Sequence, residues 1–123
     1  MNKDLRASDY LSHIAQAIER IQRFTAGLDE AAFLDNELVQ DAVLRNIEII
    51  GEASNQIQRT APDFASAHPE IPWRVLYAMR NRISHAYEQV DLELVWKTVQ
   101  HDLPHLQAQV HPRLASLLRQ GTN

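Results

Sequence analysis

The chain has 123 residues, no cysteine and a formal net charge of −4 at pH 7. This length predicts a single domain spanning residues 1–123, and the lack of cysteine excludes disulfides and thiolate metal sites. The net charge argues against a general nucleic-acid binder, and no apolar run approaches membrane-spanning length. The acidic N-terminal residues are unlike a signal peptide, so we expect a cytoplasmic protein without membrane contact.

Apolar residues recur at helical rather than alternating spacing, which predicts an all-α fold. The first predicted helix spans 8–24, with Ser8 as its N-cap and residues 25–27 as its end. The connection that follows is expected to bring Phe33 and Leu34 towards the core.

The second predicted helix begins after Asp35 or Asn36 and runs to about Thr60. It is apolar on more than one side, which is typical of a helix that is central or that also faces a partner chain. Gly51 lies in its middle, where glycine costs about 1 kcal/mol relative to alanine, so we expect another helix to approach closely there. The residues that widen its apolar stripe are Leu38, Ala42, Ile49 and Ala53.

A loop with one turn of helix is predicted over 62–69, followed by a third helix over 72–85. Asp91 is expected to cap a fourth helix, whose apolar residues alternate at spacings of three and four. Pro104 should kink or divide that helix just before itself, and Pro112 offers a second break. Together these elements predict an up-and-down bundle of four or five helices with a kinked last helix.

Arg80, His85 and Tyr87 lie at the end of the third predicted helix, and the first two suit phosphodiester cleavage. A guanidinium can hold a phosphate through two parallel hydrogen bonds. A histidine can take a proton from a ribose 2′-hydroxyl or give one to the leaving oxygen, with no metal or cofactor. On a regular helix Arg80 and His85 point about 140° apart. The two can meet over one ligand only if the long arginine reaches round or the helix loosens near Ser84, and we expect the second.

A structural role is the alternative for the same residues. Arg80 can pair with an acid on the second helix, and His85 can be a helix-end cation. Tyr87 can pack its ring on the end of the bundle while its hydroxyl caps a carbonyl. With ten arginines and six histidines in the chain, one such pair is close to chance expectation, so the residues alone favour this alternative.

His101 and His105, four residues apart, form a second candidate site, for a metal ion. Pro104 lies between them, and no helix supplies the remaining ligands of a di-metal bundle. Two solvent-facing histidines near a helix start are the favoured interpretation, so no metal site is expected.

Glu48 and Glu52 lie one helical turn apart and could act as a carboxylate pair. We favour a role as partners of Arg45 or of arginines on the third helix. Trp73 and Trp96 are interpreted as core anchors and not as a platform for stacking bases.

Several stretches, in order along the chain, resemble HepT-like proteins of the HEPN superfamily, the toxin partners of minimal nucleotidyltransferase antitoxins. The likeness runs from about Tyr10 to Leu118. The matching stretches are 40–53 (QDAVLRNIEIIGEA), 69–74 (PEIPWR), 79–87 (MRNRISHAY), 90–96 (VDLELVW) and 102–104 (DLP).

The resemblance implies a helical homodimer with two motifs at a shared cleft, and a metal-independent endoribonuclease of a type VII-like toxin–antitoxin pair. Arg80 and His85 would carry catalysis, supported by Asn81 and Arg82. The RNA substrate would be a tRNA or an mRNA, cut to a 2′,3′-cyclic phosphate and a 5′-hydroxyl. Tyr87 would be the hydroxyl to which the nucleotidyltransferase attaches AMP, which silences the toxin.

The chain departs from the family pattern at three positions, where Ser84, Ala86 and His101 stand in place of an apolar or small residue, a glycine and an asparagine. Alanine lacks the freedom of glycine at positive φ, so the turn beside His85 is expected to differ slightly. The alternative function is a non-catalytic helical dimer that docks a nucleotidyltransferase and is modified by it.

Overall fold

A computed structural model describes residues 3–121 of the chain, and within that range it contains helices and no strand. The all-α prediction is therefore confirmed. The helices are α1 (Lys3–Thr25), α2 (Glu30–Leu34), α3 (Glu37–Thr60), α4 (Pro62–Ala67), α5 (Trp73–His85), the 3₁₀ helix η1 (Tyr87–Gln89), α6 (Leu92–Lys97), the π-helical turn η2 (Thr98–Asp102) and α7 (Leu103–Gly121).

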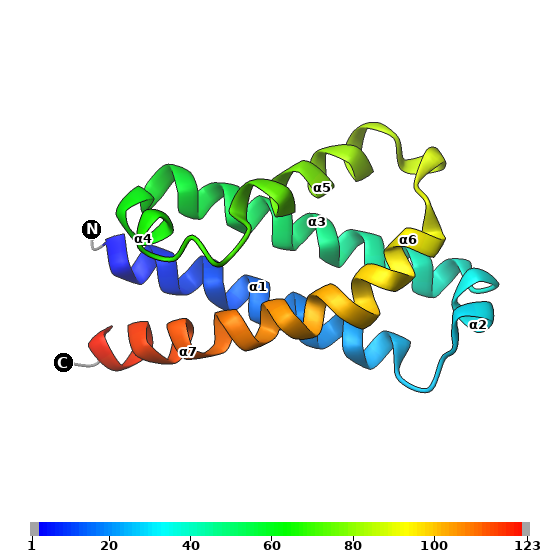
Figure 1. The fold of residues 1–123 in the computed structure, drawn as a ribbon, viewed down its shortest axis with the longest axis horizontal. Helices are drawn as coiled ribbons and strands as arrows, with labels where there is room; N and C mark the ends of the chain where they lie inside the picture. Colours follow the sequence, from blue (N-terminus) through cyan, green and yellow to red (C-terminus); the bar gives the residue numbers. More distant parts are fainter. Residues whose placement is uncertain (1–2, 122–123) are drawn as a thin grey trace.

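Four long segments run up and down beside one another, namely α1, α3, α5 and the continuous α6–η2–α7 rod (Figure 1). α1 packs against α3 and α7, and α5 packs against α3. α3 is therefore central, as its wide apolar surface predicts. Both ends of the described chain lie at the same end of the bundle (Figure 1).

The core is made of apolar side chains at helical spacing on α1 and α3. Burying each one contributes about 1.5–3 kcal/mol relative to leaving it exposed. The fully buried members on these two helices include Leu11, Ile14, Ile18, Ile21, Val43 and Ile57. Leu38 does not belong to the core, because it is 81% exposed near the start of α3.

Two local predictions near the N-terminus are wrong. α1 begins at Lys3, so Ser8 is a buried residue inside the helix and not its cap. Nothing in residues 3–7 opposes a helix, since most of them are good helix formers. In the next connection Phe33 is fully buried, with its ring centroid 5.3 Å from that of Trp96, whereas Leu34 stays partly exposed.

The predicted helix starts at α3 and α6 are confirmed by their caps. The Asn36 side-chain oxygen accepts from the Val39 N–H at 3.1 Å. The Asp91 carboxylate accepts from the N–H groups of Glu93 and Leu94 at 3.1 and 3.2 Å. Each cap satisfies backbone donors that have no partner within the helix.

The last long rod widens at η2, immediately before Pro104. Proline has no N–H, and its ring collides with the carbonyl four residues earlier in a regular helix, so a π-helical turn relieves both problems. The predicted irregularity is therefore confirmed. Pro112 lies inside α7, which continues past it, so the second possible break is not present.

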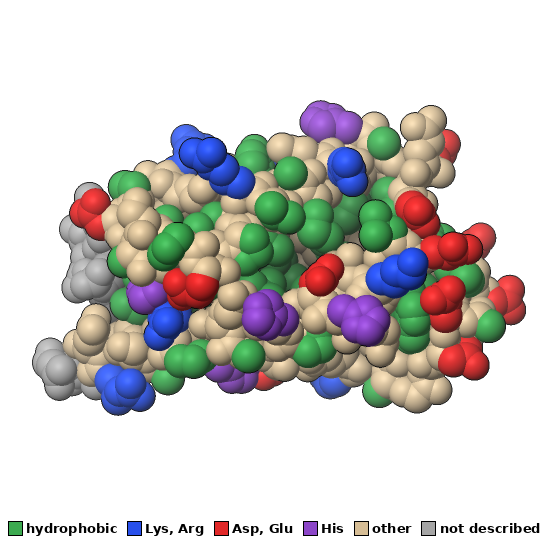
Figure 2. All heavy atoms as spheres, viewed as in Figure 1, with side chains coloured by type: hydrophobic (Ala, Val, Ile, Leu, Met, Phe, Trp, Pro, Cys, Tyr) green, Lys and Arg blue, Asp and Glu red, His purple; other side chains and the backbone are tan. Residues whose placement is uncertain are grey.

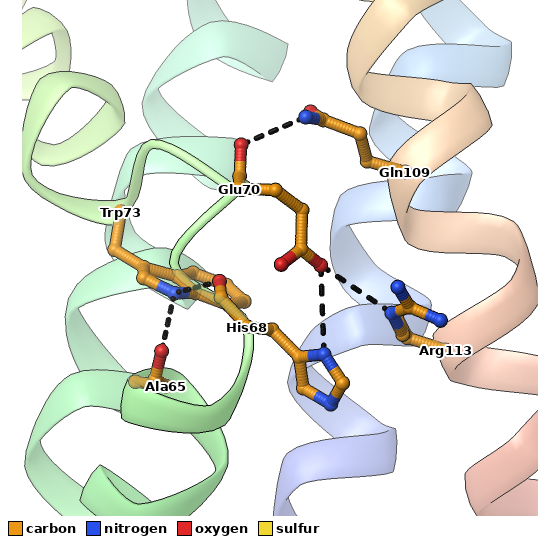
Figure 3. A network of polar contacts seen from close by, with 6 residues as sticks. All are labelled: Ala65, His68, Glu70, Trp73, Gln109 and Arg113. Atoms are coloured by element: carbon orange, nitrogen blue, oxygen red, sulfur yellow. Dashed lines mark hydrogen bonds and ion pairs between the residues drawn. The ribbon is translucent and has the colours of Figure 1, made fainter.

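The loop between α4 and α5 is fastened to α7 by polar contacts (Figure 3). Gln109 Nε2 donates to the Glu70 carbonyl at 2.7 Å, and Arg113 Nε and His68 Nδ1 lie 3.4 and 3.5 Å from Glu70 Oε2. The pKa of Glu70 is lowered, first by a hydrogen bond from its own backbone N–H and then by Arg113 and His68. These contacts hold the loop just before α5 against α7.

An apolar groove separates α5 from the α6–α7 rod, and we call it the α5–α7 groove. It comprises two hollows of about 300 and 380 Å³ that share Ile47, Met79 and Thr98. Hydrophobic side chains gather along this hollowed strip (Figure 2). At its edges, Val75 and Leu94 are 59% and 51% exposed. Among the described residues, no helix is long and apolar enough to cross a membrane.

Candidate functional site

Acidic side chains on one face of α3 contact the predicted motif of α5. Asp41, Glu48 and Glu52 are spaced by seven and four residues, so they share one face of the helix, and we call them the α3 carboxylates. Glu52 Oε2 lies 3.3 Å from Arg80 Nε. Glu48 Oε2 accepts a hydrogen bond from Ser84 Oγ at 2.7 Å. The antiparallel helix α5 thus presents its polar edge to the α3 carboxylates.

Arg80 pairs with Glu52 of α3, as the structural alternative predicted. The two side chains are one-third and nearly one-half exposed. An exposed ion pair of this kind contributes only about 0–1 kcal/mol to stability. The guanidinium can therefore exchange Glu52 for a phosphate at little cost.

The expected loosening of the helix near Ser84 is wrong. α5 remains regular through His85, and the Ala86 N–H bonds the Arg82 carbonyl at 2.9 Å to close its last turn. Ser84 bonds to Glu48 and does not compete for the helix backbone. Arg80 and His85 therefore leave the helix about 140° apart.

Asn81 connects the two sides of the helix. Arg80 Nη1 donates to Asn81 Oδ1 at 3.0 Å, so the long arginine bends round the helix towards its neighbour. Asn81 lies one turn before His85, on the same face. The guanidinium is therefore bound both to Glu52 on α3 and to Asn81, whose position lies between those of Arg80 and His85 around the regular helix.

His85 and Arg82 are exposed on the last turn of α5. The unpaired carbonyls and the dipole at a helix C-terminus favour cations there. Within residues 3–121 the structure contains no hydrogen bond or ion pair of the His85 side chain. The ring is thus accessible to a ligand from solvent.

Tyr87 lies beyond the helix, in η1, and its hydroxyl donates to Asp41 Oδ1. The contacts of Arg80 with Glu52 and of Ser84 with Glu48 set the register of α5 against α3. In that register, residue 87 would lie opposite Arg45 if α5 continued as a regular helix. The chain leaves the helix at Ala86, so the tyrosine reaches Asp41, one turn farther along α3. The Tyr87 side chain is 44% exposed. Its hydroxyl donates to a carboxylate, whereas the structural alternative had predicted a backbone carbonyl as the acceptor.

The environment of Tyr87 keeps its hydroxyl protonated. The hydrogen bond to Asp41, then partial burial and the negative charges of Asp41 and Glu48, raise the pKa of Tyr87 to about 12. At neutral pH the side chain is therefore a phenol whose proton already points at a carboxylate.

A polar hollow of about 280 Å³ lies beside Arg80, between α1 and α3. Arg45, Tyr10 and His13 contribute to its walls, and the Tyr10 and His13 rings meet edge to face with centroids 6.0 Å apart. The hollow adds a second guanidinium and two rings to the Arg80 side of the site.

The other candidates take structural or surface positions. His101 and His105 are exposed, and among the described residues no group of three or more His, Cys, Asp or Glu is placed to hold a metal ion. Trp73 and Trp96 are buried, as predicted. Trp73 Nε1 donates to the carbonyls of Ala65 and His68, at 3.2 and 3.1 Å.

Asp41 is the site residue that the sequence interpretation missed. Its spacing of seven residues from Glu48 places it on the same helix face, and that spacing was the available signal. Its partner could not be assigned, because the pairing depends on where α5 ends.

Gly51 allows α3 and α5 to approach closely at Arg80. A Cβ on Gly51 would lie 2.6 Å from the Leu76 carbonyl oxygen and closer still to the Cβ of Arg80. The close helix approach that was expected at this glycine is therefore present, and it sets the distance between Arg80 and the α3 carboxylates.

Gly51→Ala is expected to lower the free energy of unfolding by about 1–2 kcal/mol. The clash with α5, typically about 1–3 kcal/mol, outweighs the gain of about 1 kcal/mol from better helix propensity. Urea denaturation would measure the change. Gly27→Ala is the matched control, because Gly27 has φ 78° but open space around it, so only backbone strain is added. A neutral or stabilising Gly51→Ala would contradict the close approach.

Comparisons with known proteins find one family model and several related chains. Residues 14–112 match the family model described as ribonuclease HepT-like. The chain is 49% identical over 98 residues to Probable ribonuclease HepT of Thermococcus cleftensis, which covers 80% of this chain and 86% of that protein. It is 34% identical to Putative RNase MJ1380 of Methanocaldococcus jannaschii, over 88% and 94% of the two chains.

A third relative is longer than this chain. Gamma-glutamylcyclotransferase and putative RNase MJ0434 of Methanocaldococcus jannaschii is 38% identical over 89% of this chain, but the match spans only 47% of that protein. No solved structure matches the chain.

Proposed function

Because the chain belongs to the ribonuclease HepT-like family of the HEPN superfamily, we propose that it is an endoribonuclease that cleaves RNA without a metal ion. The observation that carries the proposal is the placement of three residues on the last two turns of α5, where Arg80 is bonded to Asn81 and His85 is exposed. It combines a phosphate-binding guanidinium with an accessible group suited to proton transfer.

In the proposed reaction Arg80 exchanges Glu52 for the scissile phosphate, while Asn81 holds the guanidinium on the side of His85. The ribose 2′-oxygen attacks the adjacent phosphorus, and the bond from that phosphorus to the 5′-oxygen of the next nucleotide breaks. His85 takes the proton from the 2′-hydroxyl or supplies one to the leaving 5′-oxygen. Arg82, exposed one turn before Ala86, adds positive charge for the RNA backbone.

The proposal includes a partner, a minimal nucleotidyltransferase that silences the ribonuclease as an antitoxin by attaching AMP to Tyr87. Support comes from the position of Tyr87, two residues beyond His85 with a partly exposed ring. A phosphate there would compete for the motif arginines, and the adenosine would obstruct access to them.

We also propose that the active form is a homodimer. The supporting observation is the α5–α7 groove, an apolar strip that is open in the single chain and flanks the motif helix. Contiguous exposed apolar surface of this kind marks an interaction site. A second copy would also double the arginines available to RNA.

A second candidate is a non-catalytic helical dimer that docks the nucleotidyltransferase and serves as its substrate. The pairing of Arg80 with Glu52 favours this candidate, because it gives the arginine a structural role. Both candidates use the same end of α5, so they differ in RNA cleavage and not in partner.

Incubation of purified, unmodified protein with total RNA in the presence of EDTA tests the proposal. We expect undiminished cleavage, with fragments that end in a 2′,3′-cyclic phosphate and a 5′-hydroxyl, read by end-specific ligation and mass spectrometry. A strict need for a divalent ion would rule out the mechanism. No cleavage, together with AMP labelling by the partner, would select the second candidate.

A further inference from the structure

The contact between Tyr87 and Asp41 is formed by two segments that are 46 residues apart. Asp41 is exposed near the start of α3, and the Tyr87 ring is 44% exposed in η1. A nucleotide or another protein can therefore reach the hydroxyl oxygen while its proton is hydrogen-bonded to the Asp41 carboxylate. The ribonuclease chemistry proposed above makes no use of this pair.

A phenol is a weak nucleophile until its proton is removed. The pKa of Tyr87 is raised to about 12, so spontaneous ionisation at neutral pH is rarer than for an ordinary tyrosine, whose pKa is about 10. An adjacent base solves this problem, because it takes the proton as the new bond forms. The Asp41 carboxylate already accepts that hydrogen bond, so no rearrangement is required.

Resting on the proposed role of Tyr87 as the acceptor of AMP, we propose that Asp41 is the base that activates its hydroxyl. The phenolic oxygen forms a bond to the α-phosphorus of ATP, and the bond from that phosphorus to the pyrophosphate oxygen breaks. Pyrophosphate leaves with the bonding electrons, and the proton of Tyr87 passes to the Asp41 carboxylate. This chain thereby supplies part of the catalytic apparatus for its own modification.

Glu48 is the other acid that acts on Tyr87, and its position does not suit the same role. It influences the tyrosine through its charge, but its carboxylate accepts a hydrogen bond from Ser84. Glu48 therefore provides a matched control with the same change of charge and without contact to the reacting oxygen.

The first test needs no partner protein and uses an adenosine that carries a sulfonyl fluoride, which labels tyrosine oxygens with loss of fluoride. Labelling of Tyr87 in the full chain at pH 7 is followed by peptide mass spectrometry, with Tyr87→Phe as the blank. Asp41→Asn is expected to slow labelling at least about tenfold, Asp41→Glu to restore part of the rate, and Glu48→Gln not to slow it. Circular dichroism checks that each variant is folded.

A purely electrostatic role of Asp41 predicts the opposite sign. Removing the carboxylate lowers the pKa of Tyr87 towards its ordinary value, so more phenolate is present and labelling accelerates. Labelling of Asp41→Asn at or above the wild-type rate would therefore overturn the proposal. So would an equal slowing by Glu48→Gln.

The second test uses a minimal nucleotidyltransferase, the partner class proposed above, with radiolabelled ATP. Asp41→Asn is expected to reduce the rate of AMP transfer at saturating ATP by about 10²–10⁴-fold, the usual effect of losing a positioned base, with little change in KM. If Tyr87→Phe is labelled as well as the wild type, the assignment of Tyr87 fails, while the sulfonyl fluoride result still decides whether Asp41 acts as a base.

Discussion

Replacement of His85 with alanine is expected to reduce RNA cleavage by about 10²–10⁴-fold, the usual effect of losing a positioned acid–base group. The side chain is exposed on the last turn of α5, and the described part of the chain gives it no hydrogen bond that the substitution would break. Surface substitutions of this kind usually change stability by less than about 0.5 kcal/mol. The loss should therefore appear in the rate and not in the fold.

The measurement is single-turnover cleavage of one labelled RNA by the wild type and the variant. His101→Ala is the matched control, because His101 is also an exposed histidine on a helix but lies on the α6–α7 rod, away from the motif. It should cleave at the wild-type rate. Undiminished cleavage by His85→Ala would remove His85 from the mechanism.

Sedimentation velocity on the same preparations separates chemistry from assembly. Both variants and the wild type should sediment as dimers at micromolar concentration, since none of the substitutions touches the α5–α7 groove. A wild-type chain that is monomeric and still cleaves RNA would contradict the proposed homodimer. An inactive His85→Ala that has lost its dimer would implicate association instead of proton transfer.

Local signals in the sequence predicted most of the fold. Asn36 and Asp91 each cap a helix because their short side chains reach backbone donors within three residues, whatever the rest of the chain does. Pro104 affects its own helix through its missing donor and its ring. Ser8 misled the interpretation, because a serine that caps and a serine that packs inside a helix look alike in sequence.

The contacts between α3 and the motif residues could not be predicted from local sequence signals. Residues 29–52 contain seven acids, and which of them meets Arg80 depends on the register of α3 against α5. Gly51 predicted that another helix approaches α3 closely, but it did not identify that helix as α5. The contact of Tyr87 with Asp41 also depends on the exact end of α5, which is the least predictable property of a helix.

Tyr87→Phe is expected to abolish labelling by the nucleotidyltransferase while RNA cleavage continues. The substitution keeps the ring and removes the acceptor oxygen, so no bond to AMP can form. It also removes the exposed hydrogen bond to Asp41, and a typical hydrogen bond contributes about 0.5–1.5 kcal/mol to stability. The variant should therefore remain folded and escape silencing by the partner.

Tyr77→Phe and Tyr10→Phe are the matched controls for that substitution. Tyr77 lies on α5 with its ring centroid 6.0 Å from the Arg80 guanidinium carbon, and Tyr10 borders the polar hollow beside the same arginine. Both tyrosines lie near Arg80, so either one is a rival acceptor, whereas the hydroxyl that donates to Asp41 is that of Tyr87. Labelling with radioactive ATP, followed by peptide mass spectrometry, distinguishes the three tyrosines.

Persistent labelling of Tyr87→Phe, with AMP on Tyr77 or Tyr10, would show that the other tyrosine is the acceptor. Full labelling of both controls and none of Tyr87→Phe would assign the switch to Tyr87, in η1 just beyond the end of α5.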